Sequence, residues 1–181
     1  MSLDHLWAGW RTAYVTSVST SEIAPDDDPT RSDQNSDDPA RCVFCRIAAS
    51  GPPSADNGVL WRGALTYAVL NAYPYANGHL MVLPIRHLGS LDDLGDDEAA
   101  ELWSALHRGV QAITAALGAE GVNIGANLGP AAGAGIPRHL HLHAVPRWRG
   151  DTNFMTTVAG TRVLPEALGV TWEKIHRLWP D

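Results

Sequence analysis

Three histidines alternate with two leucines in the segment His139-Leu140-His141-Leu142-His143. Side chains on a β-strand point alternately to its two faces, so a strand here would group the imidazoles on one face and bury the leucines on the other. Imidazoles grouped in this way can serve as acid, base, nucleophile or metal ligand. Two uses fit: ligation of a catalytic zinc ion, or attack on phosphorus by one histidine that its neighbours orient.

The loop before these histidines is rich in glycine and favours the second use. Gly129, Gly133 and Gly135 all lie within ten residues of His139. Glycine lets backbone N–H groups approach a ligand closely, and successive N–H groups form a nest for an anion. A nucleophile beside such donors predicts a phosphate as the electrophile. Three arginines near the histidines could supply donors for a second anion: Arg138, Arg147 and Arg149.

Cys42 and Cys45 are the two cysteines of the chain, in the spacing C-x-x-C. One such pair cannot build a disulfide framework. Three interpretations stay open, namely a redox dithiol, half of a metal site, and two ordinary reduced thiols.

The hydrophobic pattern predicts strands on both sides of one long helix. Short apolar runs, separated by glycines and by the turn Asn77-Gly78, predict strands near 59–61, 65–73 and 79–87. Apolar residues then recur every three or four positions over 96–117, which predicts a helix that Gly118 ends. Strands are expected again at 122–129 and 139–148, and a last helix from about Pro165. The fold class is α+β, with an antiparallel sheet of about five strands and the long helix on one face.

Three segments differ in composition. Residues 1–18 form an arm whose Trp7, Trp10 and Tyr14 are expected to dock on the domain or on a second subunit. Residues 19–40 are rich in Ser, Asp and Pro and predict an acidic, mobile loop. Residues 41–181 form the catalytic domain.

The charge of the chain is concentrated in that acidic loop. Residues 22–38 hold seven acidic residues and Arg31, so they account for −6 of the formal net charge of −7. The nearly neutral remainder lacks the basic face that nucleic-acid binding requires. Apolar runs fall short of the ~20 residues of a membrane span, and the first 15 residues lack a secretory pattern. We therefore expect a cytoplasmic protein that binds neither nucleic acid nor membrane.

The motifs together resemble the histidine triad (HIT) superfamily of nucleotide hydrolases and transferases, which act on an α-phosphate. HLHLHAVPRW fits its histidine signature. Five further segments resemble the bacterial diadenosine tetraphosphate phosphorylase-like branch: WRTAYV, CVFCRI, YAVLNAYPYANGHLMVLPIRH, GVNIGANLGPAAGAGIPR and GDTNFM. The likeness covers most of 41–181 and part of the arm. Arg138 departs from it, because that branch is expected to carry an acidic residue there.

The resemblance implies a role for individual positions. His141 would be the nucleophile that forms a nucleotidyl-histidine intermediate, with His139 and His143 on either side of it. Asn71 would contact the ribose and Asn127 the phosphates. Val69, Leu70 and Ala72 would lie by the base, and Gly133, Ala134 and Gly135 would line the α-phosphate.

The resemblance also implies a cofactor and partners. Cys42, Cys45, His87 and His139 would hold a structural zinc ion, and the covalent scheme requires no catalytic magnesium. The expected activity is phosphorolysis or hydrolysis of dinucleoside polyphosphates such as diadenosine tetraphosphate, by a homodimer that takes a nucleotide and phosphate. Two alternatives stay open: an adenosine phosphoramidate-type hydrolase, and a nucleotide-binding protein of low turnover, at which Arg138 hints. His79, which opens an apolar strand, is expected to be structural.

Overall fold

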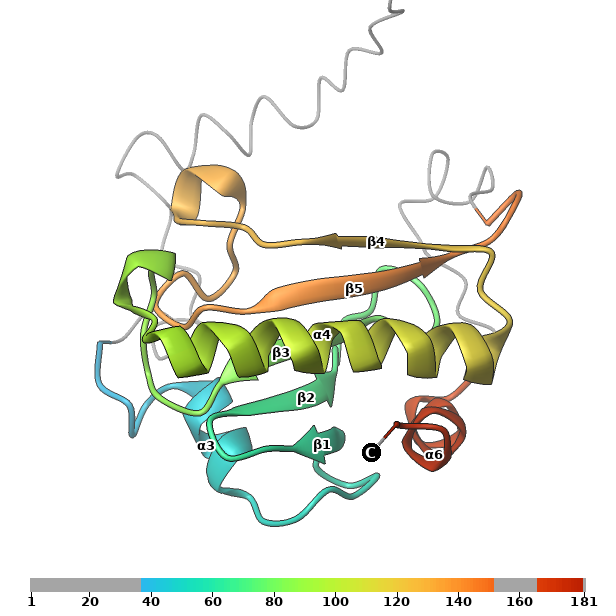
Figure 1. The fold of residues 1–181 in the computed structure, drawn as a ribbon, viewed down its shortest axis with the longest axis horizontal. Helices are drawn as coiled ribbons and strands as arrows, with labels where there is room; N and C mark the ends of the chain where they lie inside the picture. The colour runs from blue at the N-terminus through green and yellow to red at the C-terminus, as the bar shows by residue number, and fades with distance from the viewer. Residues whose placement is uncertain (1–36, 152–165, 181) are drawn as a thin grey trace, which may run out of the picture.

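Five antiparallel strands form a single sheet in the order β1-β2-β3-β5-β4 (Figure 1). The computed structural model describes residues 37–151 and 166–180. The strands are β1 (Val59–Arg62), β2 (Thr66–Leu70), β3 (Leu80–Pro84), β4 (Gly121–Gly125) and β5 (Leu142–Arg147). The helices are α3 (Val43–Ala49), α4 (Asp96–Leu117) and α6 (Leu168–Arg177), with 3₁₀ turns η1 (Leu91–Asp93) and η2 (Pro130–Ala132).

Helix α4 has the bounds that the apolar spacing predicts, because both of its ends carry strong signals. Three acidic residues occupy its first turn, where the helix dipole favours negative charge. Glu98 also accepts a hydrogen bond from the Gly95 N–H at 3.0 Å. Gly118 ends the helix in the left-handed region at φ +62°, which glycine adopts without strain. Figure 1 shows α4 lying across one face of the sheet.

The two faces of the sheet bury different apolar clusters. Leu80 and Val82 of β3 pack toward α4, in a cluster that also holds Leu102, Leu106 and Ile113 of the helix. Met81 and Leu83 of the same strand face the other way and pack with Phe44 of α3. Strands β2 and β3 are buried along their whole length, which explains why their sequences read as continuous apolar runs. Pro84 is the last residue of β3, a position at which proline is tolerated in a central strand.

The two edges of the sheet differ. Side chains of α6 cover β1: Trp172 Nε1–H donates to Val59 O at 2.8 Å, and His176 Nδ1 lies 2.8 Å from Leu60 O. His176 is therefore part of the contact between α6 and β1. Strand β4 pairs with β5 on one side, and its residues are largely exposed. A groove of about 460 Å³ lies beside β4, lined among others by Leu91, Trp103 and Ile124.

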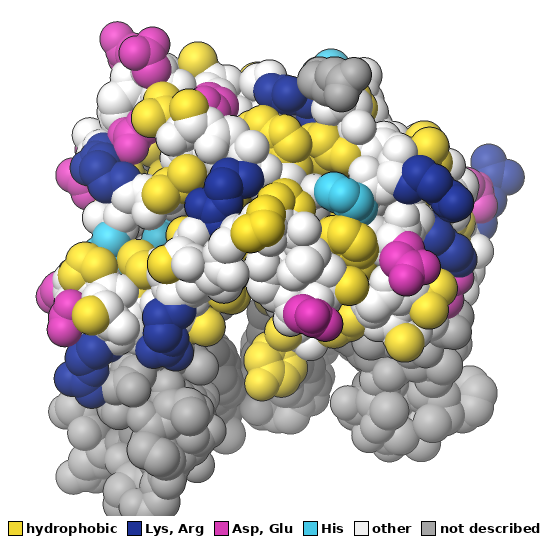
Figure 2. Space-filling view, turned by 90° about the horizontal axis from the view of Figure 1, so that it is seen from below, with side chains coloured by type: hydrophobic (Ala, Val, Ile, Leu, Met, Phe, Trp, Pro, Cys, Tyr) yellow, Lys and Arg dark blue, Asp and Glu magenta, His cyan; other side chains and the backbone are white. Residues whose placement is uncertain are grey.

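The sequence-based fold class is confirmed, with five strands and a long helix on one face. Helix α3, which Cys42 caps, is an element that the sequence did not predict. The arm 1–18 and residues 19–36 of the acidic loop lie outside the described residues, and their roles stay predictions. No helix within 37–151 and 166–180 has the length and apolarity needed to cross a bilayer. Figure 2, which views the side of β1, α3 and α6, shows basic side chains interspersed with acidic and apolar ones.

Candidate functional site

The histidine segment keeps its predicted alternation, but only part of it is a strand. Strand β5 begins at Leu142, so His139 and His141 lie in the segment before it. Leu140 and Leu142 pack toward α4. His143 pairs with Met81, whose side chain belongs to the cluster on the opposite face. The histidines therefore lie on the face of the sheet that α4 leaves uncovered.

His141 has the geometry of a nucleophile. Its Nδ1 lies 2.7 Å from the backbone oxygen of His139. A carbonyl can only accept a hydrogen bond, so Nδ1 carries the proton and Nε2 keeps a lone pair. The side chain is buried, and its ring centroid lies 5.2 Å from that of Phe44. Burial lowers the pKa of His141 below its usual value, so the imidazole is neutral at pH 7.

His143 stands beside this nucleophile. The ring centroids of His141 and His143 are 5.0 Å apart, and the rings are nearly perpendicular. Burial, with a smaller effect of His141, lowers the pKa of His143 to about 4. Its Nδ1 lies 2.9 Å from Nε2 of His79. Its Nε2 is buried and has no hydrogen-bond partner among the described residues, so this polar atom is available to a ligand.

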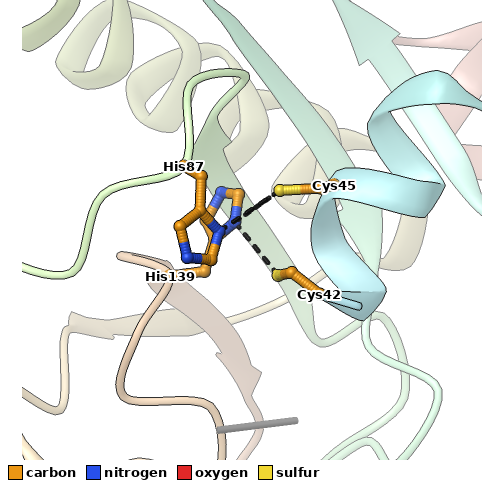
Figure 3. Close-up of side chains that lie close together, drawn as sticks. All are labelled: Cys42, Cys45, His87 and His139. Atoms are coloured by element: carbon orange, nitrogen blue, oxygen red, sulfur yellow. Dashed lines mark hydrogen bonds between the residues drawn. The ribbon is translucent and has the colours of Figure 1, made fainter. Parts of the chain in front are cut away.

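A second group of side chains can hold a metal ion (Figure 3). It consists of Cys42, Cys45, His87 and His139. Their ligand atoms all lie within 4.8 Å of one another. Cys42 Sγ is 3.4 Å from His139 Nδ1, and Cys45 Sγ is 3.3 Å from His87 Nδ1. A tetrahedral zinc ion with bonds of about 2.3 Å to sulfur and 2.0 Å to nitrogen would place such atoms roughly 3.5 Å apart. The donor set and its spacing therefore fit zinc.

The surroundings of this group determine which nitrogen of His139 can bind a metal and raise the pKa of one thiol. His139 Nε2 lies 2.9 Å from the Pro84 carbonyl oxygen, so Nε2 carries the proton and Nδ1 is left as the ligand atom. Burial, together with the neighbouring Cys42, raises the pKa of the Cys45 thiol to about 12. A redox dithiol and a zinc ligand both use the thiolate, and a bound zinc ion would itself stabilise the thiolates and lower this pKa.

Two glycines of the loop adopt left-handed backbone conformations. Gly129 and Gly133 adopt φ values of +80° and +84° on either side of the 3₁₀ turn η2. The N–H of Gly133 is used within the loop, where it bonds to Pro130 O at 2.9 Å. The Asn127 amide donates to Gly133 O at 3.4 Å. A Cβ built at Gly133 or Gly135 would meet no atom within 4 Å, so open space adjoins the loop.

The residues expected near the nucleoside have different environments. Val69 and Leu70 are buried, but in opposite clusters, with Leu70 on the α4 side. Ala72 is exposed. The Asn71 side chain accepts a hydrogen bond from the Tyr73 N–H at 2.9 Å, and its amide nitrogen lies 3.3 Å from His79 Nδ1. These assignments to base and ribose stay predictions.

Comparison with known proteins agrees with this geometry. The HIT domain family matches residues 53–150. This chain belongs to the HIT family. A protein named AP-4-A phosphorylase from Mycobacterium tuberculosis is 38% identical over 179 residues, which cover 98% of this chain and 85% of that protein. An adenosine 5'-monophosphoramidase, hnt1, from Schizosaccharomyces pombe is 30% identical over 134 residues, 74% of this chain and 95% of that protein.

A solved structure shares the fold. The zinc-bound histidine triad family protein from Mycobacterium smegmatis has a TM-score of 0.64 and 27% identity, and the match covers 78% of this chain and 95% of that one. The HIT-like fold predicted from sequence is thus confirmed.

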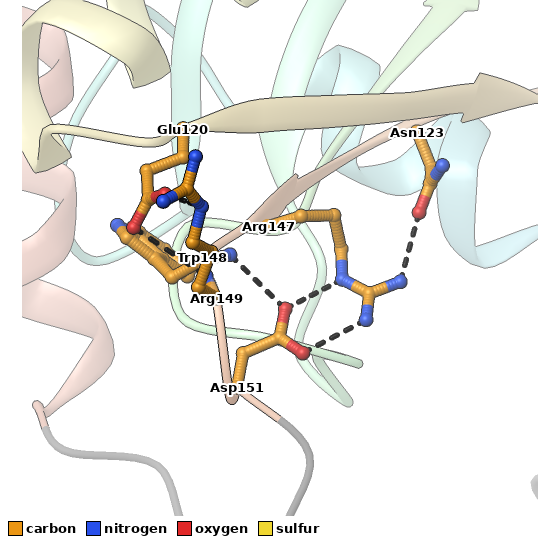
Figure 4. A network of polar contacts seen from close by, with 6 residues as sticks. All are labelled: Glu120, Asn123, Arg147, Trp148, Arg149 and Asp151. Carbon is orange, nitrogen blue, oxygen red and sulfur yellow. Dashed lines mark hydrogen bonds and ion pairs between the residues drawn. The ribbon is translucent and has the colours of Figure 1, made fainter.

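The three arginines of this HIT protein do not form the anion seat that the sequence suggested. Arg147 lies at the far end of β5, about 13 Å from His143 at the rise of a strand. It binds the Asp151 carboxylate through two nitrogens and also donates to Asn123 (Figure 4). Arg149 pairs with Glu120, and Arg138 pairs with Asp37 at 3.4 Å. Any seat for a second anion must therefore come from other groups.

His79 is the site residue of this HIT protein that the sequence-based interpretation missed. It is fully buried, and its Nε2 lies 2.9 Å from His143 Nδ1, so it contacts the histidine cluster, while the expectation that it is structural stays a prediction. Its sequence position two residues before Met81 carries the signal, because Met81 pairs with His143. The proximity of His79 to His143 can be recognised only when the register between β3 and β5 is known.

Proposed function

We propose that this HIT protein cleaves dinucleoside polyphosphates, such as diadenosine tetraphosphate, at the α-phosphate. The observation that carries the proposal is the tautomer of His141, whose lone pair on Nε2 is set by the backbone oxygen of His139. The glycine loop, which adjoins open space, and the buried Nε2 of His143, which has no hydrogen-bond partner among the described residues, support it, because N–H groups of both can donate to a phosphate. The likeness to a relative named AP-4-A phosphorylase supports the substrate class.

The reaction we propose has two displacements. His141 Nε2 attacks the α-phosphorus, a P–N bond forms, and the P–O bond to the leaving nucleoside polyphosphate breaks. An oxygen of inorganic phosphate or water then attacks the same phosphorus, and the P–N bond breaks to restore the neutral imidazole. Covalent catalysis divides one hard displacement into two easier ones. Preorganised N–H donors stabilise the charge on the transferring group.

We propose zinc as the metal of the Cys42, Cys45, His87 and His139 group, in a structural role. When bound, the ion would cross-link α3 to the segments that carry His87 and His139. His139 matters to both groups, since its imidazole faces the thiols while its backbone oxygen accepts a hydrogen bond from the His141 Nδ1–H. A fixed His139 thereby holds the nucleophile in its reactive tautomer.

Phosphate is expected to be the preferred acceptor. Incubation with diadenosine tetraphosphate and ³²P-labelled inorganic phosphate should give ATP and labelled ADP, because the nucleotidyl group passes to phosphate. The His141→Ala variant is the matched control and should give neither product. Equal amounts of ATP and AMP, unchanged by added phosphate, would instead identify a hydrolase.

The same assay, run in parallel with an adenosine phosphoramidate as substrate, separates the two alternatives. A phosphoramidate-type hydrolase would release AMP from an adenosine phosphoramidate while leaving the dinucleotide intact. A protein of low turnover would bind the dinucleotide and form no product. Either outcome would overturn the proposed substrate class.

We further propose that the HIT protein forms a homodimer through β4. The outer side of this strand has no strand partner among the described residues, and the groove beside it exposes Trp103 (62%) and Ile124 (49%). Antiparallel pairing of β4 with its copy would cover both features.

Light scattering after gel filtration tests the dimer. We expect twice the chain mass for the wild type and the monomer mass for Ile124→Lys, because a lysine on an edge strand opposes pairing. Val170→Lys, at a similarly exposed apolar position on α6, serves as the control and should stay dimeric. A monomeric wild type, or a dimeric Ile124→Lys variant, would contradict the interface.

A further inference from the structure

Two exposed tyrosines lie close to the histidines, in the turn that joins β2 to β3. Tyr73 is 86% exposed and Tyr75 is 50% exposed. Single exposed apolar side chains are common on folded proteins, but two aromatic rings beside a reactive centre mark a surface that can bind a ligand. Neither ring takes part in the two displacements proposed above.

Hydrogen bonds and a proline fix the backbone that presents these rings. The Tyr73 N–H donates to Asn71 Oδ1 at 2.9 Å. The Tyr75 N–H donates to His79 Nδ1 at 3.1 Å. Pro74 stands between the two tyrosines, and its ring fixes its own φ angle and restricts the residue before it. Tyrosine has few rotatable bonds, so a ring held in this way binds a ligand at a low cost in conformational entropy.

Aromatic rings contact both ends of the histidine segment. At its beginning, the ring centroid of Phe44 lies 5.5 Å from that of His139 and 5.2 Å from that of His141. At its end, the ring centroid of Tyr75 lies 6.0 Å from that of His143, with 28° between the two planes. The ring of Tyr75 thus continues the row that runs from His141 through His143, whose centroids are 5.0 Å apart.

The course of the reaction decides which part of the substrate reaches Tyr75. In an in-line displacement the leaving oxygen lies opposite the attacking atom. A leaving nucleoside polyphosphate that departs past His143 meets the ring of Tyr75 next, and the more exposed Tyr73 lies two residues before it in the same turn. The charged phosphates gain nothing from an apolar ring, whereas a nucleobase has the flat π face that stacks on one.

We propose that Tyr73 and Tyr75 form a stacking site for the base of the leaving nucleotide, which is the second nucleoside of the substrate. This site rests on the proposed function and adds a preference for substrates with two nucleosides. Since every base has a π face, stacking tolerates different bases in the second position.

A pair of matched ligands tests the site. Adenosine 5′-tetraphosphate has one adenosine and the same phosphate chain as diadenosine tetraphosphate, but it lacks the second nucleoside. Calorimetric titration of the His141→Ala variant measures binding without turnover. We expect this variant to bind the dinucleotide about tenfold more tightly than adenosine 5′-tetraphosphate, in the lower part of the range for the stacking of one base.

Substitutions of the exposed ring assign this preference to the turn. In the His141→Ala background, Tyr73→Ala should remove most of the preference by weakening the binding of the dinucleotide, while the affinity for adenosine 5′-tetraphosphate stays the same. Tyr73→Phe keeps the ring and should keep the preference. Tyr75→Leu, which keeps an apolar side chain beside His79, should lose part of it.

Two results would overturn the stacking site. One is equal affinity of the His141→Ala variant for the two ligands, and the other is a preference that survives Tyr73→Ala. Failure of the proposed function would look different, because the wild type would then leave the dinucleotide intact while the calorimetric preference for it remained.

Discussion

Replacing His141 with alanine is expected to abolish turnover, with a loss of about 10⁴-fold or more. The variant lacks the only atom that the proposed scheme bonds to phosphorus. Intact mass spectrometry of the wild type, quenched during turnover of diadenosine tetraphosphate, should show a nucleotidyl adduct that is absent from His141→Ala. His107→Ala, which alters an exposed histidine of α4, is the matched control and should keep both adduct and activity.

The metal content of the His141→Ala variant distinguishes the covalent scheme from the mechanism of a metallohydrolase. His141 is not part of the group of four possible ligands, so His141→Ala should keep its metal while losing activity. A variant that lost metal and activity together would point to the triad as a catalytic metal site. Substantial activity in a metal-loaded His141→Ala protein would exclude the covalent scheme.

Loss of the two thiols should have the largest effect on stability. The Cys42→Ser/Cys45→Ser variant is expected to bind no zinc and to lose roughly 3–5 kcal/mol of unfolding free energy, because metal binding contributes directly to folding. For a domain of this size that corresponds to a Tm lower by about 10 °C. Elemental analysis and calorimetry measure the two effects.

Reconstitution provides the control for this prediction. Wild-type protein stripped with a chelator should show the same low Tm and should recover when zinc is returned, whereas the double variant should not. Turnover should fall with the metal, since His139 orients His141. A stripped wild type with unchanged Tm would show that the four residues hold no structural ion.

Local patterns predicted some elements well because their causes are local. The bounds of α4 follow from its apolar spacing, its acidic first turn and Gly118. Helix α3 escaped prediction because seven residues are too few for a clear period. The strand expected from 139 begins only at Leu142, because His139 lies in a bend where its N–H bonds to Ile136 O at 3.4 Å and its side chain faces the thiols of α3.

In the candidate site, too, residues whose partners are close in sequence could be predicted, whereas those with distant partners could not. The role of His141 could be inferred from spacing and resemblance, and its carbonyl partner lies only two residues away. Arg147 was expected to help seat a second anion, but its guanidinium pairs with Asp151 instead. Asp151 is visible in the sequence, whereas the direction in which the end of β5 points Arg147 is not. His79 was missed because its partner His143 is 64 residues away.

The unequal edges of the sheet limit how large an assembly can become. An exposed strand is a template onto which further copies can add without end. Here Trp172 and His176 of α6 already bond to carbonyl groups of β1, which leaves β4 as the edge open to addition in the described part of the chain. If two chains paired through β4 about a twofold axis, the open edges of both sheets would be covered at once. Association of the proposed kind would therefore be self-terminating, and the chains would pair without growing into a fibre.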